Sequence, residues 1–107
     1  MLSARVDQAA GLRQLFQPRR VRVLPVIGGE GCVPRLLQLA ASLGAHGERV
    51  LILDESSGEV VSAAGVDPHG NLGDLVRGRA EFDAVAPVNT SGARVMLVAD
   101  GYEALAA

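Results

Sequence analysis

Apolar residues gather into three short continuous runs, at residues 21–27, 49–54 and 94–99. A continuous apolar run of this length is typical of a parallel strand that is buried on both faces. Pro25 is awkward within the first run because proline cannot donate a hydrogen bond to a strand ladder. The pattern therefore predicts three strands, of which the first contains an irregular position.

The stretches around these runs have helical periodicity. Residues 3–17 carry an apolar stripe at helical spacing, which predicts a helix before the first strand. A second helix is predicted over residues 34–45, with Pro34 in its first turn, where the missing N–H is tolerated. Shorter helical segments are predicted at residues 60–64, 72–77, 81–86 and 102–107, and Asn71 is expected to cap the second of them. A strand, a glycine turn, a helix and a second strand in this order form a right-handed βαβ unit.

Composition narrows the function classes. The 107 residues are 49% hydrophobic and 21% charged, close to a typical globular domain, and the net charge of −2 provides no basic surface for nucleic acid. A single cysteine excludes an internal disulfide and a multi-cysteine metal site. The apolar runs are too short to span a bilayer, so we expect a cytoplasmic protein with no direct membrane anchor. Because the chain contains no lysine, chemistry that needs a side-chain amine is excluded.

A glycine turn, Gly28-Gly29-Glu30-Gly31, joins the first predicted strand to the next helix. Such a turn can bind a phosphate, although many turns of this kind use glycine for backbone reasons alone. Residues 21–54 resemble the opening of the MinD/ParA class of P-loop ATPases, whose loop reads Lys-Gly-Gly-x-Gly-Lys-Thr/Ser and whose second strand ends in Asp-x-Asp. Residues 71–78 and 94–99 are similar to later parts of the same domain. The resemblance implies a partial three-layer P-loop fold with a short, mainly parallel sheet over residues 19–107.

The segment before this domain, residues 1–18, points to one branch of the class. Residues 7–13 read Asp-Gln-Ala-Ala-Gly-Leu-Arg and match the Asp-Gln-Ala-x-x-Leu-Arg motif of the FlhG-type flagellar-number regulators, also called YlxH or FleN. In that family the segment is an activator helix for FlhF, a GTPase related to the signal recognition particle. The resemblance implies an FlhF-like partner contacted by Asp7, Gln8, Ala9, Leu12, Arg13 and Phe16. The alternative is a helix that packs against its own sheet.

The loop departs from the family at each position that carries ATPase chemistry. Ile27 replaces the first signature lysine, Cys32 the phosphate-binding lysine and Val33 the Thr/Ser that binds Mg²⁺. Pro34 also removes a backbone N–H at the start of the helix. Phosphoryl transfer needs positioned cations and a metal, so we expect no ATP hydrolysis, no metal and no cofactor. The residual nucleotide loop comprises Gly28, Gly29, Glu30, Gly31, Cys32 and Val33.

The second strand keeps only one carboxylate of the family motif. Asp54 is present, whereas Ser56 stands at the second aspartate, and the sequence ends before the strand that would carry the Walker B aspartate. In the MinD class that strand lies between the first and second strands. Unless the first and second strands pair directly, its absence leaves backbone groups unpaired. We therefore expect either self-association, for which a homodimer is one form, or loose packing.

Three hypotheses follow. We favour a non-enzymatic regulator of flagellar number that binds and stimulates an FlhF-like GTPase through its N-terminal helix. The alternatives are a weak nucleotide-binding protein of the MinD class, which would use ATP and Mg²⁺, and an inactive truncated relative. Cys32 is better explained as a substituted loop position than as a nucleophile, and we expect His46 and His69 in exposed segments.

Overall fold

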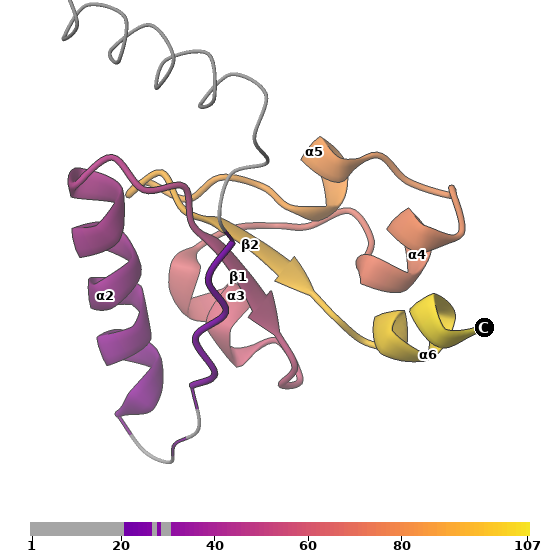
Figure 1. Ribbon diagram of the computed structural model, residues 1–107, viewed down its shortest axis with the longest axis horizontal. Coiled ribbons are helices and arrows are strands. Elements are labelled where there is room, and N and C mark those ends of the chain that lie inside the picture. The colour runs from indigo at the N-terminus through magenta and orange to yellow at the C-terminus, as the bar shows by residue number, and fades with distance from the viewer. Residues whose placement is uncertain (1–20, 27, 29–30) are drawn as a thin grey trace, which may run out of the picture.

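The computed structural model describes residues 21–26, 28 and 31–107. Two strands, β1 (Leu51–Asp54) and β2 (Arg94–Leu97), form a parallel sheet (Figure 1). The described part of the chain also contains the helices α2 (Cys32–Ala45), α3 (Glu59–Ala64), α4 (Leu72–Val76), α5 (Phe82–Val85) and α6 (Gly101–Ala106). The expected α/β class is confirmed, with a short parallel sheet.

The two strands pair in a simple register from Leu51 opposite Arg94 to Asp54 opposite Leu97. The carbonyl of Asp54 accepts a hydrogen bond from Val98 N at 3.0 Å, so the even-numbered residues of β1 direct their backbone groups toward β2. The far edge of β2 is partly covered, because the N–H of Val95 donates to the carbonyl of Pro87 at 3.2 Å. The far edge of β1 has no such partner among the described residues.

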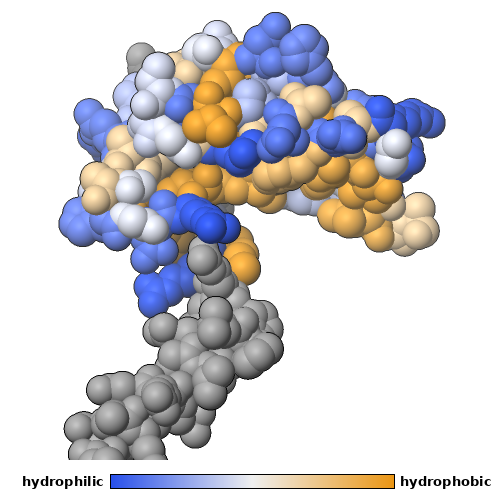
Figure 2. Space-filling model, turned by 90° about the horizontal axis from the view of Figure 1, so that it is seen from above, coloured by the Kyte–Doolittle hydropathy of each residue, from blue (hydrophilic) through white to orange (hydrophobic). Residues whose placement is uncertain are grey.

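Side chains alternate across the sheet and build two apolar clusters. Ile52 and Val95 pack with Ala40 of α2 and Val60 of α3 on one face. On the other face, β2 and the segment after it pack against α4 and α5, through Leu72, Val85, Ala86, Met96 and Val98. In Figure 1, α4, α5 and α6 gather beyond β2. Leu51 and Leu53 of β1 lie on the same face as Met96, because Leu53 is its partner in the register, yet they stay 44% and 41% exposed. Figure 2 shows that apolar side chains reach the surface of the molecule in several places.

The first predicted strand is wrong over residues 21–26. These residues form neither helix nor strand, and all six are exposed, with Val21 at 86% and Val23 at 83%. A strand needs a neighbour to receive its backbone hydrogen bonds, and no described strand pairs with this segment. Pro25 further weakens the segment as a ladder partner. The described sheet therefore consists of β1 and β2 without the first predicted strand.

The other elements agree with the sequence to within a few residues. α2 begins at Cys32 rather than at residue 34, and the two later strands and four short helices lie where the sequence predicts them. Asn71 caps α4 as expected. The predicted N-terminal helix at residues 3–17 and Ile27 lie outside the described residues. Among the described helices, none has the length and apolarity needed to cross a membrane.

Candidate functional site

The end of the glycine turn is set by the backbone of one residue. Gly31 precedes α2 with a φ of 81°, a left-handed backbone conformation that residues other than glycine rarely adopt. No side chain caps the helix at this position. Glycine is therefore required here for the turn itself, whether or not a ligand binds.

Gly28 has a separate reason to be glycine. A Cβ atom placed on it would lie 2.8 Å from Sγ and 2.9 Å from Cβ of Cys32, so the backbone approaches that side chain closely. Cys32 and Val33 are half-buried in the first turn of α2, and Val33 packs against the core. Where the resemblance places a phosphate-binding lysine and a hydroxyl, the structure thus has a thiol beside the turn and an apolar residue against the core.

Asp54 is the most buried charged residue described, with 1% of its surface exposed. Its carboxylate accepts hydrogen bonds from the backbone N–H groups of Ser56 at 2.9 Å and Val61 at 3.1 Å, and from the hydroxyl of Ser56. Val61 lies in the first turn of α3, so the carboxylate joins the end of β1 to the start of that helix. Since both carboxylate oxygens are occupied by protein donors, Asp54 acts here as an organiser of the loop.

Ser56 completes this arrangement. Its hydroxyl oxygen accepts from Glu59 N at 3.1 Å and from Gly58 N at 3.3 Å, which satisfies donors at the start of α3. The position where the resemblance places a second aspartate thus accepts from backbone donors just before and at the start of α3.

The structure does not join the predicted loop residues and Asp54 through any hydrogen bond between described residues. His46 and His69 are exposed, as the sequence predicts. No group of three or more potential metal ligands occurs among the residues that the structure describes. The remaining predicted site residues lie outside the described ranges: Asp7, Gln8, Ala9, Leu12, Arg13, Phe16, Gly29 and Glu30.

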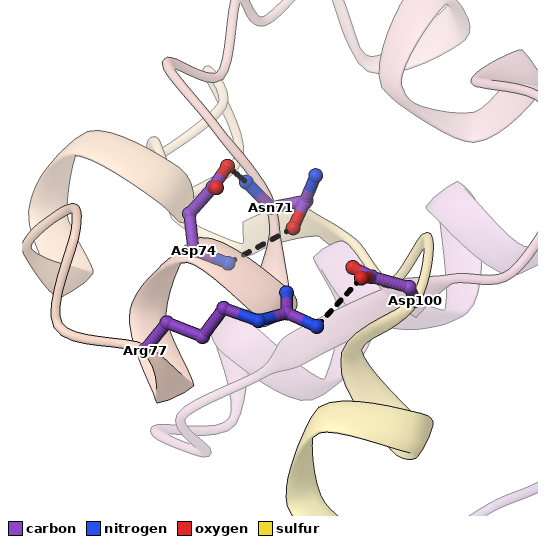
Figure 3. A network of polar contacts seen from close by, with 4 residues as sticks. All are labelled: Asn71, Asp74, Arg77 and Asp100. Atoms are coloured by element: carbon purple, nitrogen blue, oxygen red, sulfur yellow. Dashed lines mark hydrogen bonds and ion pairs between the residues drawn. The ribbon is translucent and has the colours of Figure 1, made fainter.

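A polar network between α4 and α6 was not predicted in full (Figure 3). Asn71 and Asp74 form a capping box, with each side chain accepting from the other's backbone N–H at 3.0 Å. Arg77, one turn on, forms an ion pair of 2.8 Å with Asp100, at the N-cap of α6. The Arg77 guanidinium holds the pKa of the Asp100 carboxyl below its ordinary value through this hydrogen bond. The network fastens the two short helices to each other.

A shallow cavity of about 420 Å³ lies at the amino ends of the two strands. Arg49, Leu51, Phe82 and Arg94 contribute to its lining. The guanidinium of Arg94 sits 5.0 Å from the centre of the Phe82 ring and forms an ion pair of 3.1 Å with Asp83. The sequence signal for this site is an arginine at or near the start of each strand, since Arg94 is the first residue of β2 and Arg49 lies two positions before β1. The guanidinium of Arg94 already pairs with Asp83. Arg49 also lines the cavity, and it has no ion-pair partner among the described residues.

A comparison with protein-family models, with curated proteins and with solved structures finds no match for this chain.

Proposed function

We propose that the chain is a non-enzymatic cytoplasmic regulator of flagellar number, whose N-terminal segment binds and stimulates an FlhF-like GTPase. The proposal is carried by the motif at residues 7–13, which directly precedes a region that resembles the MinD-class domain. We propose accordingly that residues 19–107 are a partial P-loop fold that serves as a scaffold.

The chemistry around the loop supports a role without ATP turnover. Residues 28–33 contain no basic side chain to balance a triphosphate, and Glu30 adds a negative charge. Gly28 and Gly31 have backbone reasons to be glycine, and the carboxylate of Asp54 is occupied by protein donors. Each contact that such a site lacks typically costs orders of magnitude in rate.

The side chains of the N-terminal segment divide into docking and catalytic roles toward the GTPase. As a helix, it would place Ala9, Leu12 and Phe16 on one face, and burial of a leucine or phenylalanine is worth about 1.5–3 kcal/mol. Gln8 can both donate and accept hydrogen bonds, so it can orient the water that attacks the γ-phosphate. Arg13 can pair with carboxylates of the partner. Asp7 stabilises the start of the helix.

The test measures GTP turnover by an FlhF-like GTPase at increasing concentrations of the full chain. Leu12→Ala should raise the half-saturating concentration by about tenfold or more and leave the maximal stimulated rate nearly unchanged. Gln8→Ala should do the reverse and lower the maximal rate by about tenfold or more. Gln14→Ala, the same substitution off the apolar stripe, is the matched control and should change neither quantity.

Two results would contradict the proposal. A chain that stimulates the GTPase while a peptide of residues 1–18 does not would place the activity in the α/β part. Calorimetry that shows micromolar ATP binding would favour the MinD-class nucleotide-binding alternative, since we expect no affinity tighter than about 1 mM. In the same preparation, phosphate release from ATP with Mg²⁺ should remain at the background level.

A further inference from the structure

The outer edge of β1 is unpaired in the described part of the chain. The even-numbered residues of β1 direct their backbone groups to β2, as the hydrogen bonds from Arg94 N to Val50 O and from Val98 N to Asp54 O show. The N–H and C=O groups of Leu51 and Leu53 therefore point away from β2. Exposed edges of this kind template pairing with another chain, and this edge carries neither a proline nor a lysine as protection.

The side chains along this edge are complementary to themselves. Exposure alternates from residue 49 to residue 55, and the exposed residues are Arg49, Leu51, Leu53 and Glu55. Leu51 and Leu53 share one face of β1, and an extended backbone places Arg49 and Glu55 on the same face. Read in the opposite direction, the series becomes Glu, Leu, Leu and Arg. An antiparallel copy of this strand therefore places a leucine opposite each leucine and an opposite charge at each end.

We propose that two copies of the chain pair antiparallel through the outer edges of β1, which makes a four-stranded sheet with its two-fold axis at Ile52. Leu51 then faces Leu53 of the second copy, and Arg49 faces Glu55 of the second copy. Each Leu51–Leu53 pair exchanges two backbone hydrogen bonds, so the four polar groups that each copy leaves unpaired at these residues are satisfied. The interface is isologous, as in most dimers.

Hydrogen bonding restricts the register. Only odd-numbered residues present their backbone groups at this edge, so any shift must be by two residues. A shift of two places a charged residue opposite a leucine and separates both charge pairs. The register centred on Ile52 is the one that matches all four side chains.

A second copy explains this edge better than the chain's own residues 21–26. Those residues form no strand and pair with no described strand, and Leu51 and Leu53 stay 44% and 41% exposed in their presence. Pro25 would also remove one donor from any ladder formed there. The dimer is tested by changes at residues 49 and 55 and the proposed GTPase stimulation by changes at residues 8 and 12, so the two proposals can fail independently.

The first test is sedimentation of the full chain from about 10 µM to about 1 mM, a range in which a small strand interface should associate. We expect the average mass to rise toward that of a dimer. Arg49→Glu and Glu55→Arg should each raise the dissociation constant by about tenfold or more, since each places like charges opposite one another. Arg79→Glu, an exposed reversal of the same size away from β1, is the matched control and should leave it unchanged.

Two charge exchanges then identify the interface. The double variant Arg49→Glu/Glu55→Arg restores both opposed pairs and should dimerise within about threefold of the original chain. A mixture of the two single variants should form a heterodimer at concentrations where neither associates alone. Circular dichroism and urea unfolding of each variant establish that the fold is retained.

Amide hydrogen exchange provides the independent measurement. Protection of the Leu51 and Leu53 amides should rise with protein concentration, whereas the Ile52 amide, which faces β2, should be protected throughout. Three results would overturn the proposal: a monomer at about 1 mM, a dimer insensitive to all the charge changes, or a monomer whose Leu51 and Leu53 amides are already protected. The last result would mean that another segment of the same chain covers the edge.

Discussion

Removal of the Asp54 carboxylate should destabilise the protein more than any comparable change on the surface. The group is 1% exposed and accepts from Ser56 N at 2.9 Å, from Val61 N at 3.1 Å and from the hydroxyl of Ser56. Asp54→Ala leaves two backbone N–H groups without their acceptor, at the junction between β1 and α3. Asp54→Asn keeps the shape, but its amide nitrogen meets at least one of these donors.

The magnitude follows from the two backbone bonds. A hydrogen bond to a charged group contributes about 1.5–3 kcal/mol to stability, so loss of both gives about 3–6 kcal/mol. In the variants, water can hydrogen-bond to some of the freed N–H groups and so reduce the loss of stability. We therefore expect a loss of about 3 kcal/mol for Asp54→Ala and about 2 kcal/mol for Asp54→Asn. A chain of this size has a free energy of unfolding of about 5–15 kcal/mol, and the loss is therefore a large fraction of it.

Urea unfolding measures the effect. With a slope of about 1–3 kcal/mol/M, the midpoint of Asp54→Ala should fall by about 1 M or more, with the slope unchanged. Asp67→Asn, at an exposed aspartate, is the control and should stay within about 0.5 kcal/mol of the original chain. If both Asp54 variants also lie within that range, the carboxylate does not organise the loop. Addition of Mg²⁺ should leave the original midpoint unchanged, whereas a clear rise would mean that the carboxylate binds a cation.

The remaining predictions concern two glycines and one ion pair. Gly101→Ala should destabilise by about 1–3 kcal/mol, because its Cβ would lie 2.5 Å from Cβ and Cγ of the buried Leu72. Gly44→Ala, within α2 and near only a carbonyl oxygen at 3.5 Å, should instead stabilise by about 0.5–1 kcal/mol in the same urea assay. Since Arg77 lowers the pKa of Asp100 below 3.8, their pair stabilises the fold above that pH and loses its contribution as the pH falls further. The difference in urea midpoint between the original chain and Asp100→Asn should therefore shrink between pH 7 and pH 3, and a constant difference would contradict this.

Features that depend only on residues close together in the sequence were predicted well. The Asn71 cap and its partner Asp74 lie within four residues of each other. β2 buries Val95 on one face and Met96 on the other, as the apolar run predicts, whereas β1 buries only the face that carries Ile52 and Asp54. The start of α2 was misplaced by two residues because the prediction relied on Pro34, whereas the left-handed Gly31 sets the boundary.

Features that depend on distant residues were not predictable in the same way. Residues 21–26 have a strand-like composition, yet a strand exists only where a neighbour receives its hydrogen bonds, and no local pattern reveals whether that neighbour is present. The ion pair between Arg77 and Asp100 likewise joins residues 23 positions apart (100 − 77). The roles of residues 7–16 and of Gly29 and Glu30 remain predictions from sequence.

The Asp54 loop shows how a serine at position 56 completes the hydrogen bonding of a buried carboxylate. An aspartate at position 56 would place a second carboxylate beside a buried one, and like charges this close cannot both ionise without a cation to balance them. Serine at that position donates a hydrogen bond to Asp54 and accepts from Gly58 N and Glu59 N, so one hydroxyl serves both the carboxylate and the backbone donors that lead into α3. The loop is thus self-sufficient in hydrogen bonds without a metal.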